Sequence, residues 1–170
     1  MPMADMLLPE FDHETAVTRL LLERAPESRV LWTPHQKSWT LGDLCLHLAN
    51  LPSWAALVLQ HVSFDINPPD GPRPKRQFES QPETLRLFDR HVAEARQAIA
   101  GASDPEFLAR WTLRDADRTV FTMPRISALR SFVLSHMIHH RGQLSVYLRL
   151  CDVPLPPMYG PTADSAGQDV

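Results

Sequence analysis

Two histidines, His136 and His140, are spaced so that they could bind one metal ion. If this segment is helical, a separation of four residues places the two rings one turn apart and about 40° apart around the axis. Their imidazoles can then converge on one point, as they do in the His-x-x-x-His element of zinc proteases. No glutamate stands between them, so the protease motif itself is excluded.

A third histidine, His47, lies on an apolar stripe in a different segment. It follows Leu44 by three residues and precedes Leu51 by four, a spacing that places it on the core-facing side of one helix. A buried imidazole without a partner costs roughly 1–3 kcal/mol, and a metal shared with His136 and His140 would satisfy all three rings. Three neutral nitrogen ligands leave one coordination position open, as in catalytic zinc sites. A hydrogen-bonded cluster of core histidines is the alternative interpretation.

His139 offers a second geometry, because it lies three residues after His136 and could also chelate a metal with it. The two rings would lie about 60° apart, on the other side of His136 from His140. The apolar stripe of this segment, which includes Val133 and Leu144, favours His140 as the ligand. The sequence leaves open whether His139 replaces it. Four further histidines are expected to face solvent or to lie in loops: His13, His35, His61 and His91.

The elements that position these histidines are predicted to be helices. The clearest one begins with a capping box at Thr40–Asp43, in which the side chains satisfy free N–H groups of the first turn. Pro52 interrupts its apolar stripe and should kink the helix. A second capping box at Ser80–Glu83 begins another helix, which Gly101 should end. Helical periodicity is found in four segments: about 11–23, 40–63, 80–101 and 124–150.

The connecting segments have other patterns. Residues 67–74 are too rich in proline to form a helix and should be a loop. Segments 111–113 and 119–122 look extended, which predicts a small hairpin or an irregular crossover. The tail from Asp152 should be non-helical, and beyond Asp164 it is expected to be disordered. The predicted fold class is therefore all-α: a four-helix bundle with a short extended hairpin before the last helix.

Length and composition narrow the functional classes. A chain of 170 residues favours one domain, spanning 1–170, that needs no structural metal in order to fold. A net charge of -3 argues against a nucleic-acid partner. The N-terminus lacks a basic region followed by an apolar run, and no stretch of about 18 apolar residues occurs, so neither a signal peptide nor a membrane span is expected. Cys45 and Cys151 form no disulfide framework, which fits a protein of the reducing cytoplasm.

Several of these residues resemble a known family. The last predicted helix contains His136–Leu144, an earlier one contains a core histidine in Leu46–Leu48 after Ser38–Thr40, and the chain closes with a Pro-rich tail, Val153–Asp164. Together they resemble the signature of the DinB-like (damage-inducible, YfiT-related) superfamily, over roughly residues 11–164. The resemblance implies a four-helix bundle with up-down-down-up connectivity. It also implies one divalent transition metal, usually nickel or zinc, bound by His47, His136 and His140.

The resemblance also suggests what such a site does. Some members are thiol S-transferases that join a low-molecular-weight thiol, such as bacillithiol or mycothiol, to an electrophile, and this is the leading hypothesis. Others are described as metal-dependent hydrolases, and dimers are common. A divalent charge lowers the pKa of a bound thiol or a bound water, so both reactions stay open. A third hypothesis is a homodimer that binds a metal or small ligand without catalysis. Side chains that could line the pocket are Asn50, Trp54, Gln143 and Tyr159.

Overall fold

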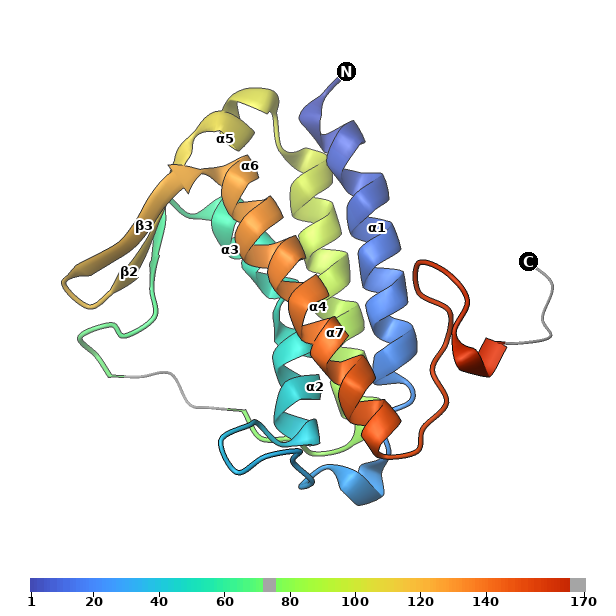
Figure 1. Ribbon diagram of the computed structural model, residues 1–170. Coiled ribbons are helices and arrows are strands. Elements are labelled where there is room, and N and C mark those ends of the chain that lie inside the picture. The colour runs from blue at the N-terminus through green and yellow to red at the C-terminus, as the bar shows by residue number, and fades with distance from the viewer. Residues whose placement is uncertain (72–75, 166–170) are drawn as a thin grey trace.

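Four long helical segments packed side by side form most of the molecule, and a small sheet lies to one side of them (Figure 1). The computed structural model describes residues 1–71 and 76–165. The first and last segments run in one direction and the two middle ones in the other, which is the order of directions that the resemblance implies (Figure 1). The helices are α1 (Met3–Leu22), α2 (Leu41–Asn50), α3 (Ser53–Gln60), α4 (Gln81–Gly101), α5 (Asp104–Leu108), α6 (Arg125–Ala128) and α7 (Ser135–Leu150). The strands are β1 (Ser63–Asp65), β2 (Arg110–Asp115) and β3 (Arg118–Pro124).

Buried apolar side chains from all four segments form one core. Phe11 of α1, Leu48 of α2, Phe88 of α4 and Leu144 of α7 are almost fully enclosed in it. These positions follow the three- and four-residue spacing of amphipathic helices, so each helix buries one stripe. Within the described residues, none of the helices is long and apolar enough to cross a membrane.

Both predicted capping boxes are confirmed as helix starts. The hydroxyl of Thr40 accepts the backbone N–H of Asp43 at 3.1 Å, and the hydroxyl of Ser80 begins α4 by accepting an N–H in the same way. The start of the first helix was predicted too late, because α1 begins at Met3 rather than near residue 11. Its first N–H donates to the carboxylate of Asp104, 2.7 Å away at the start of α5, and a cap from so distant a residue leaves no local signal in the sequence.

Pro52 divides the second segment into α2 and α3, as predicted. Proline has no N–H to continue the helical ladder, so nearby carbonyl groups need other partners. The hydroxyl of Ser53 donates to the carbonyl oxygen of Asn50 at 2.7 Å, and Nδ1 of His91 lies 2.9 Å from the carbonyl oxygen of Ala49. The prediction that His91 faces solvent is therefore wrong, because it is half-buried where α4 meets this break.

The prediction of an all-α chain is wrong in one respect, because three strands form a small sheet. The predicted hairpin is confirmed as β2 and β3, which pair antiparallel. Strand β1 pairs parallel with β2 and places Phe64 opposite Leu113. Only three residues long, β1 directly follows a helix and has no strand periodicity of its own, so its pairing is dictated by the tertiary fold. Trp111 and Leu113 of β2 are buried and attach the sheet to the core.

The last helical segment contains a π-helical stretch, Leu129–Leu134, between α6 and α7. The sequence predicted one uninterrupted helix here. A π turn contains more than 3.6 residues, so it changes which side chains face inward after it. The stretch ends directly before the turn that contains His136. The loop prediction for residues 67–74 is correct as far as Gly71, and the rest of that loop, like the tail after Ser165, lies outside the described residues.

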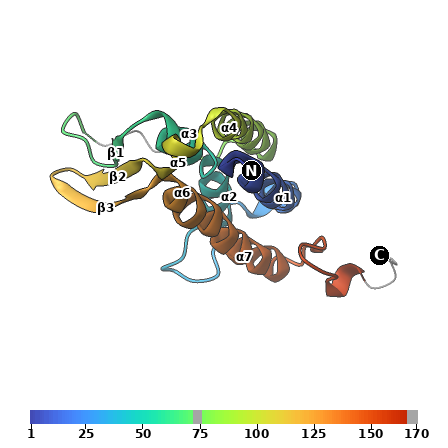
Figure 2. The same cartoon turned by 90° about the horizontal axis from the view of Figure 1, so that it is seen from above.

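A buried ion pair joins α1 to α7. Arg141 is 2% exposed and its guanidinium lies 2.6 Å from the carboxylate of Glu14, which is 9% exposed. The same guanidinium donates to the carbonyl oxygen of Glu14 at 3.0 Å and to the hydroxyl of Tyr159. That hydroxyl also donates to the Glu14 carboxylate, so the C-terminal tail is held on the same pair. Figure 2 shows this tail on the opposite side of the helices from the sheet.

Replacing Glu14 should destabilise the protein strongly. Glu14→Ala leaves the guanidinium of Arg141 buried without a carboxylate, which is expected to cost about 3–5 kcal/mol. Asp12→Ala is the matched control, because Asp12 also lies on α1 and binds an arginine of another helix, Arg96, but in an exposed pair that should be worth less than about 1 kcal/mol. Urea denaturation would measure both changes. Equal costs for the two variants would contradict this account.

Candidate metal centre

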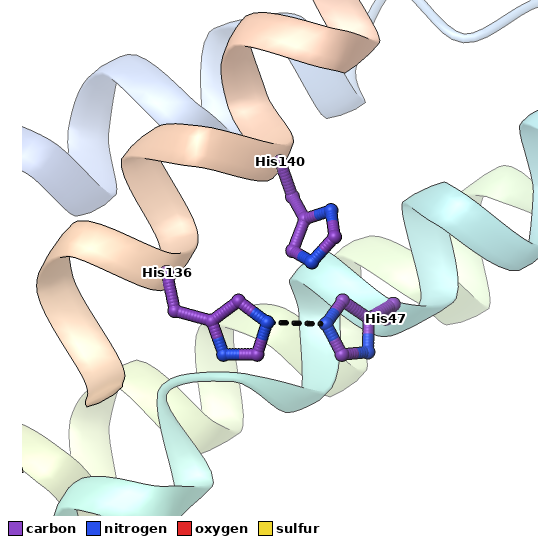
Figure 3. Close-up of side chains that lie close together, drawn as sticks. All are labelled: His47, His136 and His140. Carbon is purple, nitrogen blue, oxygen red and sulfur yellow. Dashed lines mark hydrogen bonds between the residues drawn. The ribbon is translucent and has the colours of Figure 1, made fainter. Parts of the chain in front are cut away.

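Three imidazole rings meet where α2 faces α7. Nε2 of His47 lies 3.3 Å from Nε2 of His136, and one ring nitrogen from each of these residues and from His140 lies within 4.8 Å of the others. Figure 3 shows the three rings directed toward a common point, with His47 contributed by one helix and the other two by the helix opposite. All three side chains are half-buried. The structure therefore brings together the three histidines that the sequence selected.

The spacing of the ring nitrogens suits a tetrahedral metal. Two nitrogen ligands at about 2.0–2.1 Å from a tetrahedral ion lie about 3.3–3.4 Å apart. The distance between His47 and His136 is 3.3 Å. A nitrogen of His140 lies within 4.8 Å of the other two, so the three rings are close enough together to hold one ion. Three ligands leave the fourth position of a tetrahedron open.

In His136 and His140, the ring nitrogen that faces away from the cluster contacts a hydrogen-bond acceptor. Nδ1 of His136 lies 3.3 Å from the carbonyl oxygen of Phe132, and Nδ1 of His140 lies 2.7 Å from the side-chain oxygen of Gln143. Each acceptor favours the tautomer in which Nδ1 carries the hydrogen. Nε2 then presents its lone pair to the centre of the cluster, which is the arrangement that orients histidine ligands in metal sites.

Burial keeps the three rings neutral. It lowers the pKa of His47 to about 4, with additional repulsion from the neighbouring His140 and His136. The pKa values of His136 and His140 are also lowered, in both cases chiefly by burial. Neutral imidazole is the form that binds a metal, so protons would not compete for these nitrogens at neutral pH.

Trp39 covers the cluster, and the sequence patterns did not select it as a site residue. Its ring centroid lies 4.8 Å from that of His47 and 5.3 Å from that of His140, against which it stacks at 19°. Trp39 stands in the loop before α2, on no apolar stripe, so only its place directly before the Thr40 cap could have indicated that it lies beside this helix. The side chain remains 48% exposed and forms the outer wall of the site.

Two cavities, each lined in part by Trp39, reach the cluster. The His47 cavity has a volume of about 390 Å³, and the His140 cavity has a volume of about 250 Å³. The His47 cavity is lined by Trp39, Asp43, Leu46, His47, Asn50 and Arg76. The His140 cavity is lined by Lys37, Ser38, Trp39, Leu44, His140, Gln143 and Tyr147.

The predicted pocket residues have different positions. Asn50 lines the His47 cavity, where its side-chain amide donates to the carbonyl oxygen of Leu46. Gln143 lines the His140 cavity and holds His140. Trp54 is not among the residues that line either cavity. Its ring centroid lies 5.0 Å from that of Phe132, which in turn lies 5.7 Å from that of His136.

Two further candidates lie away from the cluster. The hydroxyl of Tyr159 is held by Glu14 and Arg141 on another face of α7, so the expectation that it lines the pocket is not met. His139 is exposed and is not a member of the cluster, although its ring centroid lies 4.9 Å from that of His140.

The depressed pKa of His47 predicts how acid acts on the metal-free protein. An unfolded chain protonates this ring near pH 6.5, whereas the folded protein protonates it near pH 4. Between these values the unfolded state binds more protons, so stability that is present above pH 6.5 is lost as the pH falls to 4. Urea denaturation across this range is expected to show a free energy of unfolding that falls less in His47→Gln than in the wild type.

His61→Gln provides the control for this pH dependence, because His61 is exposed and lies outside the cluster. The free energy of unfolding of this variant should fall with pH as steeply as that of the wild type. An equally steep fall in His47→Gln would show that the buried ring is not what makes the metal-free protein sensitive to acid.

Comparison with known proteins identifies relatives of this chain. The YrdA protein of Bacillus subtilis (strain 168), described as uncharacterized, is 22% identical over 163 residues, which cover 94% of this chain and 90% of YrdA. A DinB-like protein from Bacillus cereus ATCC 10987 has a similar fold, with a TM-score of 0.67 and 16% identity over 93% of this chain and 98% of that one. The DinB-like protein YjoA of Bacillus subtilis gives a TM-score of 0.70 and 16% identity over 92% of this chain and 99% of that one.

A family model gives the most direct assignment. The model of the DinB superfamily matches residues 10–144, which is more than half of the chain and includes all three clustered histidines. This confirms the resemblance seen in the sequence. The chain belongs to the DinB superfamily.

Proposed function

We propose that His47, His136 and His140 bind one divalent transition metal, and that the loaded site activates a small thiol for transfer to an electrophile. The observation that supports this most directly is the convergence of three neutral imidazoles, two of which are oriented by acceptors at Nδ1. A cluster that served only to fill the core would have no need to direct its Nε2 atoms to one point. The open fourth position is what distinguishes a reactive site from a purely structural one.

The residues around the cluster suit a reaction between two small molecules. When bound, a divalent ion with three neutral ligands supplies a charge that lowers the pKa of a coordinated thiol or water. Thiolate is the nucleophilic form of a thiol, so such a site would support thiol transfer. Trp39 shields the cluster from bulk water, and the two cavities give each reactant a separate approach. Gln143 keeps His140 aimed at the centre.

The proposal extends to the metal and the setting of the protein. Nitrogen ligands of this type accept nickel, copper and zinc, and availability rather than affinity selects among them. We assign nickel or zinc because these are the metals that the resemblance to the family implies. A reducing cytoplasm, where small thiols are kept reduced, agrees with two cysteines that are both free. A homodimer is part of the same proposal, and light scattering on the purified protein would test it.

Metal content is the first prediction of this proposal. Untagged wild-type protein, analysed by elemental mass spectrometry, should contain close to one nickel or zinc per chain. His47→Ala, His136→Ala and His140→Ala should each lose the metal, because two imidazoles do not hold a divalent ion as three do. His139→Ala is the matched control and should keep it, since His139 lies on the same helix but outside the cluster.

A variant of Gln143 tests whether the orientation of the His140 ring contributes to metal affinity. Gln143→Leu keeps all three ligands but removes the acceptor for His140, and the metal affinity should fall roughly 10–100-fold. A wild-type protein that stays free of metal after dialysis against nickel and zinc would overturn the proposal and leave a hydrogen-bonded histidine cluster.

Activity assays then separate the three hypotheses for the metal-loaded protein. We expect consumption of a model electrophile, 1-chloro-2,4-dinitrobenzene, only when a small thiol is present, and we expect it to be lost in His47→Ala. Hydrolysis of activated esters without thiol would instead favour a metal-dependent hydrolase. Metal binding with neither reaction would favour a binding protein without catalysis.

A further inference from the structure

The His47 cavity has walls of opposite charge. Asp43, which is anionic, and Arg76, which is cationic, both line it together with His47. One oxygen of Asp43 accepts a hydrogen bond from the hydroxyl of Thr40 at 2.7 Å. The cavity therefore joins a half-buried imidazole of the proposed metal site to one fixed negative and one positive group.

Arg76 is available to a ligand. Two other arginines that line the adjacent groove are each paired with a carboxylate of their own helix, Arg86 with Glu83 and Arg90 with Glu94. Arg76 donates no hydrogen bond and makes no ion pair to any residue that the structure describes. A free guanidinium beside a cavity is a good receptor for a carboxylate, because its planar fork matches both carboxylate oxygens.

Asp43 limits the charge of the ligand. With one cationic and one anionic wall, the cavity accommodates a ligand that carries a single negative charge on the Arg76 side. A dianionic phosphate would face repulsion from Asp43 across the same space, which disfavours it relative to a carboxylate.

We propose that the His47 cavity binds a small thiol that carries a carboxylate, with Arg76 as the anchor of that carboxylate and the sulfur directed to the histidine cluster. This rests on the proposed function of the site and names its substrate class. Arg76 is thus a specificity-determining residue.

The size of the cavity agrees with such a ligand. A volume of about 390 Å³ corresponds to roughly a dozen waters, each of which occupies about 30 Å³ in the liquid. That is enough for a thiol of amino-acid to dipeptide size and too little for a large cofactor. The separate His140 cavity leaves room for the second reactant.

Ligand binding to the cobalt-loaded protein tests the proposal without relying on turnover. Coordination of a thiol to cobalt produces a sulfur-to-metal charge-transfer band, which can be titrated with 3-mercaptopropionate or with uncharged 2-mercaptoethanol. We expect 3-mercaptopropionate to bind more tightly. Arg76→Gln should weaken it roughly 10–100-fold, the factor expected for a hydrogen bond to a charged group, and leave 2-mercaptoethanol unchanged.

Arg90→Gln is the matched control, since Arg90 lies in the adjacent groove and does not line the His47 cavity. It should bind both thiols as the wild type does. Equal affinity of wild type and Arg76→Gln for 3-mercaptopropionate, or equal weakening of both thiols, would overturn the role of Arg76 alone. A wild-type protein that binds cobalt but gives no band with either thiol would overturn the proposed thiol chemistry itself.

Discussion

Arg141 carries a charge that the core cannot leave unpaired, and its neutralisation by Glu14 fixes α7 against α1. An isolated guanidinium in the interior would be very costly, so only rotations of α7 that bring it to the Glu14 carboxylate are compatible with folding. Arg141 directly follows His140 and points about 100° away from it around the helix. Fixing one side chain therefore fixes the direction of the other, and the ion pair on the α1 side aims the imidazole toward α2. The hydroxyl of Tyr159 donates to the Glu14 carboxylate and so attaches the C-terminal tail to this ion pair.

The histidine cluster itself depends on a balance between enclosure and access. The surrounding helices bury the rings enough to lower their pKa values and keep them uncharged. Complete burial would exclude a substrate, and the ring of Trp39 solves this by covering the cluster from a loop while remaining about half exposed. The side chains between α2 and α7, together with Trp39, thus keep the ligands neutral and the cluster shielded. They still leave the His47 and His140 cavities open to it.

The features that the sequence predicted are those set by local periodicity. Each of them depends on residues of a single helix and its first turn. They are the caps at Thr40 and Ser80, the break at Pro52 and the inward position of His47. Features that depend on another element were missed. The early start of α1 requires a carboxylate from α5. His91 is half-buried because its ring contacts a backbone carbonyl group that the helix break leaves without a helical partner.

The site shows the same division. The choice of His140 over His139 followed from the apolar stripe, and Gln143 was predicted as a pocket residue, whereas its hydrogen bond to His140 was not. Trp39 and Arg76 stand in irregular segments where spacing has no meaning, so only the folded chain shows that they lie at the site. Tyr159 was misplaced for a related reason, because the path of a Pro-rich tail is decided by the partner that captures its hydroxyl.

The parallel pairing of β1 with β2 has a consequence for how the chain folds. It joins Ser63 to Thr112, so all of α4 and α5 must be in place, or at least compact, before this ladder can close. Closing so long a loop costs conformational entropy, and the three residue pairs of this ladder offset little of it. The β2–β3 hairpin and the individual helices, by contrast, form from residues that are near neighbours in sequence. The β1–β2 ladder should consequently be the last pairing of the sheet to form and the first to open. The histidine cluster is built on α2 and α7, away from this ladder, so local opening of β1 need not disturb it.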